Sequence, residues 1–135
     1  MDASSQRPLE LILARNLLSS LSTPAFLADR TNDIVFYNEA AGALLGRRFE
    51  ESGPMSAEDW LNDFGPLDES GEPIPFEEQS LTLALRANRA AYARHRIRSI
   101  GGAIREVEVS GMPIIGASGF NGAMVFFWLA GEPLP

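Results

Sequence analysis

The stretch "DIVFYNEAAGALLG", residues 33–46, decides the fold because it begins as a β-strand and ends as a helix with no loop between. Its first half is rich in β-branched and aromatic residues, as strands are. Asn38 can end that strand and cap the helix, since its side-chain oxygen can accept a hydrogen bond from the first turn. Glu39 then lies at the positive end of the helix dipole, and Gly46 can take the left-handed conformation that ends a helix.

On the N-terminal side, "PAFLAD" (24–29) and the turn formers that follow it predict a β-hairpin with this stretch. Residues 8–21, "PLELILARNLLSSL", predict a helix that begins with Pro8. Its apolar side chains cover about 200° of the circumference, whereas one core needs a stripe of roughly 100°. We therefore expect this helix to bury two surfaces.

On the C-terminal side, residues 50–75 are acidic, and only "AEDWLNDF" (57–64) has helical spacing. Residues 75–88, "PFEEQSLTLALRAN", predict one longer helix, because acidic residues lie at its start and Arg86 near its end.

Two strands are then predicted over 90–99 and 103–114, joined at Gly101-Gly102, with arginines opposite glutamates. The last strand, "AMVFFWLA" (123–130), is apolar on both faces, so both must be covered.

Composition excludes several classes of function. The 135 residues, of which 45% are hydrophobic, fit one domain. With no cysteine, the chain cannot form disulfides, thiolate zinc sites or thiol nucleophiles, and this agrees with a reducing compartment, so we expect a cytoplasmic protein. A net charge of −7 disfavours nucleic acid as a partner. The longest apolar run is too short to span a bilayer, so no membrane insertion is expected.

In order, these elements resemble the PAS family of sensor domains, from about Leu18 to Leu129. The resemblance rests on "LADRTNDIVFYNEAAGALLG", on the loop and helix "PLDESGEPIPFEEQSLTLALRANRA" common in bacterial members, and on "EVSGMPIIGASGFNGAMVFFW". It implies an α+β fold with a five-stranded antiparallel sheet in the order 2-1-5-4-3. Short helices would cover one face, and the N-terminal helix the outer face. We divide the chain into an N-terminal amphipathic helix (1–22), the PAS domain (23–130) and a tail (131–135).

The resemblance also implies a small cavity under the short helices. Its flavin-adduct and yellow-chromophore branches need a cysteine, which the chain lacks, and the haem branch takes an axial histidine from the long helix, which has none. No cofactor is therefore predicted, and haem is disfavoured. We expect an apolar cavity with His95 as its one polar group, suited to a small hydrophobic molecule. The alternative is that these side chains simply fill the core. The candidate cavity residues are Leu44, Trp60, Phe64, Phe76, Leu81, Leu85, His95, Ile97, Val107, Val125 and Phe127.

We predict a sensor or regulatory domain that acts as a homodimer and contacts a signalling partner. It either stands alone or precedes an effector outside this sequence. The alternatives are a ligand-free interaction module and, less favoured, an enzyme on an unrelated α+β fold. Catalysis is not expected, because the chain has one histidine and no phosphate-binding glycine loop. The candidate dimer residues are Leu9, Leu13, Leu17, Met124, Phe126 and Trp128.

Overall fold

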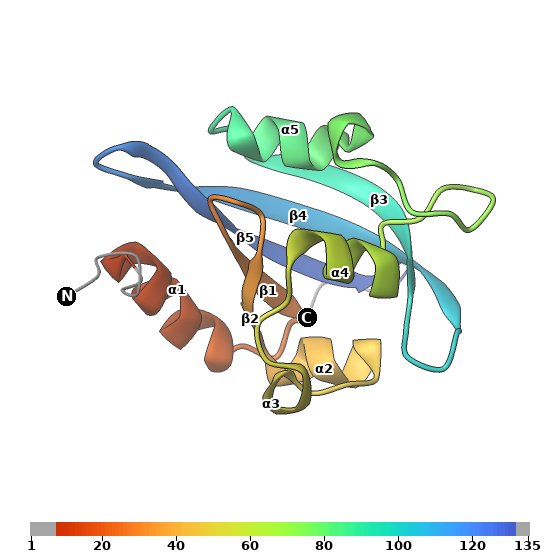
Figure 1. Ribbon diagram of the computed structural model, residues 1–135. Helices are drawn as coiled ribbons and strands as arrows, with labels where there is room; N and C mark the ends of the chain where they lie inside the picture. The colour runs from red at the N-terminus through yellow and green to blue at the C-terminus, as the bar shows by residue number, and fades with distance from the viewer. Residues whose placement is uncertain (1–7, 132–135) are drawn as a thin grey trace.

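The computed structural model describes residues 8–131. Its five strands form one antiparallel sheet in the order β2-β1-β5-β4-β3 (Figure 1), which confirms the predicted α+β fold and strand order. The predicted domain boundaries stay predictions, and residues 1–7 and 132–135 of the two predicted terminal segments lie outside the described residues. In chain order the elements are α1 (Leu9–Ser19), β1 (Ala25–Asp29), β2 (Ile34–Tyr37), α2 (Glu39–Leu45), α3 (Phe49–Ser52), α4 (Ala57–Asp63), the 3₁₀ helix η2 (Phe76–Glu78), α5 (Ser80–Arg86), β3 (Ala91–Arg98), β4 (Ile104–Gly116) and β5 (Gly119–Leu129).

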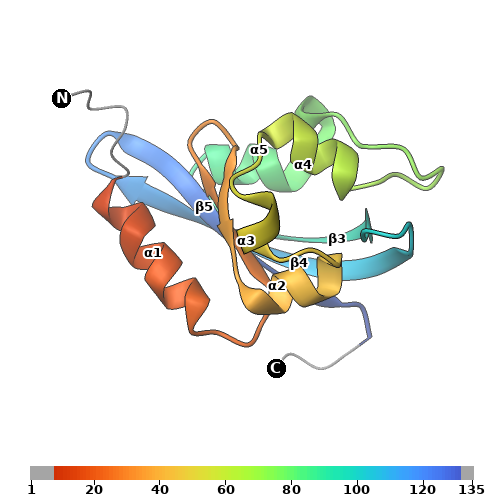
Figure 2. The same cartoon turned by 60° about the horizontal axis from the view of Figure 1, so that its bottom comes forward.

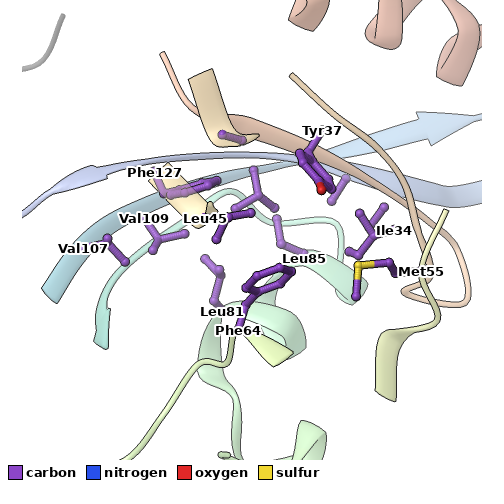
Figure 3. Close-up of a cluster of buried hydrophobic side chains, with 14 residues drawn as sticks. Ile34, Tyr37, Leu45, Met55, Phe64, Leu81, Leu85, Val107, Val109 and Phe127 are labelled. Atoms are coloured by element: carbon purple, nitrogen blue, oxygen red, sulfur yellow. The ribbon is translucent and has the colours of Figure 1, made fainter. Parts of the chain in front are cut away.

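The sheet has a hydrophobic cluster on each face. Helix α1 lies on the opposite side of the sheet from α5 (Figure 2) and buries Leu11, Ala14 and Leu18 against the outer face. The inner cluster lies between the sheet and the remaining helices (Figure 3). In β5, Val125 and Phe127 belong to the inner cluster, while Phe126 packs against the outer one. This alternation explains why the last strand is apolar on both faces.

The strand-to-helix junction forms as the sequence predicts. The side-chain oxygen of Asn38 accepts a hydrogen bond from Ala41 N at 3.0 Å and so caps α2. Gly46 ends the helix with a φ of 90°, in the left-handed region. The structure adds a second role, because Asn38 Nδ2 donates to Leu18 O at 3.1 Å and to Thr23 O at 2.8 Å. Asn38 therefore also fixes the end of α1 and the entry to β1.

The predicted helix over 75–88 is wrong in its first half. Residues 76–78 form a 3₁₀ turn, and α5 begins only at Ser80, after Gln79 takes an extended conformation (φ −86°, ψ 101°). The buried side chain of Gln79 donates to Ile74 O at 2.8 Å and accepts from the Thr82 hydroxyl at 2.8 Å. These local side-chain bonds accompany the extended conformation of Gln79, and helix propensity does not include them.

Arginines and glutamates lie opposite each other in the hairpin, as predicted. Arg94 pairs with Glu108 and Arg96 with Glu106 in the register of β3 and β4. Within residues 8–131, neither pair closes to an ion pair of 4 Å or less. Arg96 and Arg98 instead donate to the carbonyls of Glu69 and Gly71, so the second half of β3 contacts the acidic loop, residues 68–72.

Candidate functional site

A cavity of about 110 Å³ lies between the inner face of the sheet and the helices. Ten of the eleven cavity residues named from the sequence line it, namely Trp60, Phe64, Phe76, Leu81, Leu85, His95, Ile97, Val107, Val125 and Phe127. They come from α4, η2, α5 and the strands β3, β4 and β5, together with Phe64 at the end of α4. The structure thus brings together side chains that are up to 67 residues apart, from Trp60 to Phe127.

Leu44 does not line this cavity, contrary to the expectation from the sequence. Its neighbour Leu45 does, because successive residues on a helix point about 100° apart. Leu44 is half-buried against the edge of the inner cluster and borders a separate surface depression beside Arg105 and Leu129.

Sequence reasoning missed several lining residues. Val109 follows Val107 by two residues, so strand alternation alone could have placed it on the same face. Phe26 and Ile34 lie on strands recognised as a hairpin, but which face meets the cavity depends on the sheet order. The missed lining residues include Phe26, Ala28, Asn32, Ile34, Leu45, Gln79, Thr82, Val109, Phe120 and Ala123.

One wall of the cavity is aromatic. The ring centroids of Phe26 and Trp60 lie 4.9 Å apart, as do those of Trp60 and Phe64, and Phe127 lies 6.1 Å from Phe26. These separations and the tilted ring planes suit attractive edge-to-face contact. Aliphatic side chains from α5, β4 and β5 also line the cavity, namely Leu81, Leu85, Val107, Val109 and Val125.

His95 is the one titratable side chain among the described residues that line the cavity. Burial lowers the pKa of His95 below its ordinary value of 6.5, since desolvation disfavours the imidazolium. Its neighbour in the register is Val107, which is fully buried. Within residues 8–131 the ring nitrogens make no hydrogen bond to the protein. His95 therefore presents a neutral imidazole with a free donor and a free acceptor.

We expect the lowered pKa of His95 to make the protein less stable in mild acid. The unfolded chain binds a proton near pH 6.5, whereas the folded state does so only at lower pH. The free energy of unfolding should then fall as the pH drops from about 7 to about 5. Urea unfolding at several pH values measures this slope, and His95→Phe should flatten it. The carboxyl groups with a lowered pKa, such as Glu108, titrate below this window. An unchanged slope in the variant would show that His95 is not its source.

Two of the three other polar side chains in the lining, Gln79 and Thr82, are already bonded, and the third, Asn32, lies between β1 and β2. The Thr82 hydroxyl donates to Gln79 Oε1, and Gln79 Nε2 donates to Ile74 O. Their bonding capacity is thus partly spent on holding η2 and α5 together. Asn32 and His95 are the polar lining side chains without a hydrogen-bond partner among residues 8–131, and of the two His95 lies on the sheet.

The outer face carries the residues named for a dimer. Leu9, Leu13 and Leu17 are 65%, 58% and 50% exposed, on the side of α1 that faces away from the sheet. Met124 and Phe126 are half-buried against the outer cluster, beside α1. Trp128 is half-buried too, and its indole N–H donates to Glu108 at 3.2 Å. The structure leaves these six side chains on one side of the sheet, with those of α1 the most exposed.

Glu108 joins three strands on this outer face, a feature that sequence reasoning missed. It accepts from the Tyr92 hydroxyl at 2.5 Å as well as from Trp128. The bond from Tyr92 is the main cause that lowers the pKa of Glu108, and the same bond raises the pKa of Tyr92. The register of β3 and β4 places Arg94 opposite Glu108. The alternation of residues in this hairpin was therefore the sequence signal that could have placed Glu108 on the outer face.

The carboxylate of Asp68 in the acidic loop bonds to groups within the loop itself. Asp68 accepts from the backbone N–H groups of Ser70 and Glu72 and from the Ser70 hydroxyl. Among residues 8–131, no cluster of three or more metal-ligating side chains occurs. No described helix is both long enough and apolar enough to cross a bilayer.

No protein-family model matches the chain, and no curated protein does. Solved structures do match it. A PAS domain from a two-component sensor histidine kinase is 18% identical with a TM-score of 0.61, and the match covers 90% of this chain and 96% of that one. The PAS domain of a protein from Colwellia psychrerythraea is 15% identical with a TM-score of 0.64, covering 91% and 98%. The LOV protein of Rhodobacter sphaeroides is 13% identical with a TM-score of 0.73, covering 93% and 70%.

These similarities, together with the strand order and the helices on the inner face, show that the chain has the fold of PAS domains. At such identities the likeness extends to the fold alone. What the domain senses and contacts must be argued from its own side chains.

The cavity in its present shape is smaller than a flavin or a haem needs. A flavin–cysteine adduct is excluded because the chain has no cysteine. A cavity of about 150 Å³ holds one benzene molecule, and the space here is about 110 Å³. Helix α5 has no histidine that could serve as an axial ligand for haem. A flavin or haem would therefore require the inner cluster to open.

Proposed function

We propose that this chain is a signal-sensing PAS domain that works as a homodimer and takes a small hydrophobic molecule into its cavity. The observation that carries the proposal is the pair of apolar faces on α1. One face, with Leu11 and Leu18, is buried on the sheet, and the other, with Leu9, Leu13 and Leu17, is exposed. Apolar surface of this extent on a helix usually marks an interface.

A second copy of the chain is the partner we propose for that face. A two-fold interface brings the same patch of both subunits together, so a leucine-rich helix can pack against its own copy. The outer side chains of β5, Met124, Phe126 and Trp128, lie on the same side of the sheet and would extend the interface. A signalling partner would then respond to the arrangement of the two subunits.

Replacing Leu13 and Leu17 together by glutamate is expected to convert the dimer into a monomer. Four carboxylates would lie at the interface of each dimer, where they repel one another and lose their hydration. Sedimentation velocity measures the change as a drop in mass from two chains to one. Circular dichroism should remain that of the folded protein, because both side chains point away from the sheet.

Leu83→Glu is the matched control for this experiment. Leu83 is also 50% exposed on a helix, but it lies on α5, on the other face of the sheet. The control should remain a dimer. An unchanged sedimentation coefficient in the double variant would contradict the proposed interface.

The alternative is a ligand-free interaction module, and the small volume of the cavity favours it. Native mass spectrometry separates the two, because it reports subunit number and bound mass on one sample. A dimer with added mass supports the sensor, and a dimer without it supports the module. We propose the cytoplasm as its location, since a chain without cysteine is suited to a reducing compartment.

A further inference from the structure

The volume of the cavity, its aromatic side chains and its polar group together restrict the class of ligand that it can bind. This inference rests on the proposed sensing function. Its volume of about 110 Å³ is below the 150 Å³ or so that holds benzene in an engineered apolar cavity. The flexible side chains of Leu81 and Leu85 border it, so a slight shift would admit one ring. A long acyl chain or a fused ring system would need much more space.

The aromatic wall favours a flat guest. Phe26, Trp60 and Phe64 stand in a chain of tilted rings, each 4.9 Å from the next. A further ring placed against them gains edge-to-face contacts, which contribute about 0.5–1.5 kcal/mol beyond burial. An aliphatic guest of the same volume would not gain these contacts.

The charge of the site disfavours ions. No aspartate, glutamate, lysine or arginine is among the described residues that line the cavity. Arg96 and Arg98 on β3 donate to carbonyls of the acidic loop. His95 is neutral above mild acid, so it offers no countercharge. A carboxylate or an amine would be buried without a partner, at a high cost in free energy.

Two polar lining side chains have no hydrogen-bond partner within residues 8–131, Asn32 between β1 and β2 and His95 on β3. Of these two, His95 lies on the sheet itself, opposite the fully buried Val107. Gln79 and Thr82 are bonded to each other, whereas the imidazole of His95 has no protein partner within residues 8–131. A neutral imidazole accepts at one nitrogen and donates at the other. We propose that the cavity binds one uncharged, single-ring aromatic molecule with a hydroxyl group, a phenol, and that this hydroxyl is hydrogen-bonded to His95.

The test compares phenol, toluene and benzoate as probes of the purified wild-type protein, with binding followed by NMR shifts of the backbone amides. Phenol and toluene have similar volumes, so their difference reports the hydroxyl. We expect phenol to bind roughly three- to tenfold more tightly than toluene, the factor that one net hydrogen bond supplies. Benzoate should not bind detectably, because its charge would be buried.

His95→Phe removes both ring nitrogens and keeps an aromatic side chain. This variant should bind toluene and lose the preference for phenol. Tyr92→Phe is the matched control, since Tyr92 lies three residues away on β3 with its hydroxyl on the outer face, bonded to Glu108. The control should keep the preference.

Equal affinities of the wild type for phenol and toluene would overturn the inference without any variant. So would a preference that persists in His95→Phe, or the absence of binding by either probe. Sedimentation of the same samples keeps the two proposals apart. A dimer that does not bind phenol would contradict only the proposed class of ligand. A monomer that binds phenol would contradict only the proposed dimer. A larger molecule that co-purifies with the protein would support the sensing function and overturn the proposal that the ligand is a phenol.

Discussion

Asn38→Ala is expected to cost about 3–5 kcal/mol of unfolding free energy, at roughly 1 kcal/mol for each of four hydrogen bonds. The side chain is 2% exposed. Its oxygen accepts from Ala25 N and Ala41 N, both at 3.0 Å. Its nitrogen donates to Leu18 O and Thr23 O at 3.1 and 2.8 Å. Alanine would leave Ala25 N, Ala41 N and Thr23 O without this partner, whereas Leu18 O would keep its bond from Leu21 N at 3.2 Å. Urea unfolding monitored by tryptophan fluorescence measures the loss.

The matched control for Asn38→Ala is Ser56→Ala. Ser56 caps α4 through a single bond to Asp59 N at 3.1 Å, on the exposed surface. Losing an ordinary helix cap of this kind costs about 1 kcal/mol. A similar loss in both variants would mean that Asn38 acts as a helix cap and nothing more.

Asn38→Ser separates the two roles of the residue. Serine caps helices about as well as asparagine, but its short side chain cannot reach Leu18 O and Thr23 O. We expect most of the loss to remain in this variant. Amide hydrogen exchange should show weaker protection in α1, because its last turn would lose its tie to the junction. Normal protection in α1 would contradict the role of Asn38 as a link between this helix and the sheet.

That link matters for the proposed function. The exposed leucines of α1 form the proposed dimer surface, and Asn38 fixes the end of α1 to the residue that starts α2. Leu45, at the other end of α2, lines the cavity. One buried amide therefore connects the proposed dimer helix to an element that borders the proposed ligand.

The sequence could predict the features that depend on neighbouring residues. The capping of α2 by Asn38 and the turn at Gly101-Gly102 depend on local geometry, and both occur as expected. Alternation along β3 puts His95 and Ile97 on the same face of the strand, and both line the cavity. The strand order followed from the resemblance to PAS domains, because pairing between β1 and β5 leaves no local signal.

The features that the sequence could not predict depend on distant partners. The break at Gln79 is an exception, because its bonds to Ile74 and Thr82 span only five and three residues, and helix propensity does not include such side-chain bonds. The choice between Leu44 and Leu45 depends on the rotation of α2 on the sheet, since both are leucines at one end of one helix. The volume of the cavity is set by all its walls at once, so no pattern in one segment encodes it.

Phe127→Ala is expected to lower the free energy of unfolding by about 3–5 kcal/mol, as for other buried phenylalanines. Phe127 is 4% exposed, belongs to the inner cluster and lines the cavity. Its ring centroid lies 6.1 Å from that of Phe26. Removing the ring would add its volume to the existing cavity. The side chains that line the cavity would then lose further van der Waals contacts. Thermal and urea unfolding measure the loss.

Phe126→Ala is the matched control, because Phe126 is the same residue type and lies on the opposite face of the same strand. Phe126 is half-buried against the outer cluster, so less apolar area returns to water and no closed cavity forms. We expect it to lose about 1–2 kcal/mol. Toluene at saturation should restore part of the stability of Phe127→Ala, since a ligand that fills the enlarged cavity binds only the folded state. Phe126→Ala should show no greater benefit than the wild type. Two outcomes would contradict this prediction: an equal loss of stability in the two variants, or a loss below about 1 kcal/mol in Phe127→Ala. Either result would mean that Phe127 is not buried in the core, and the cavity could then not lie on that face of β5.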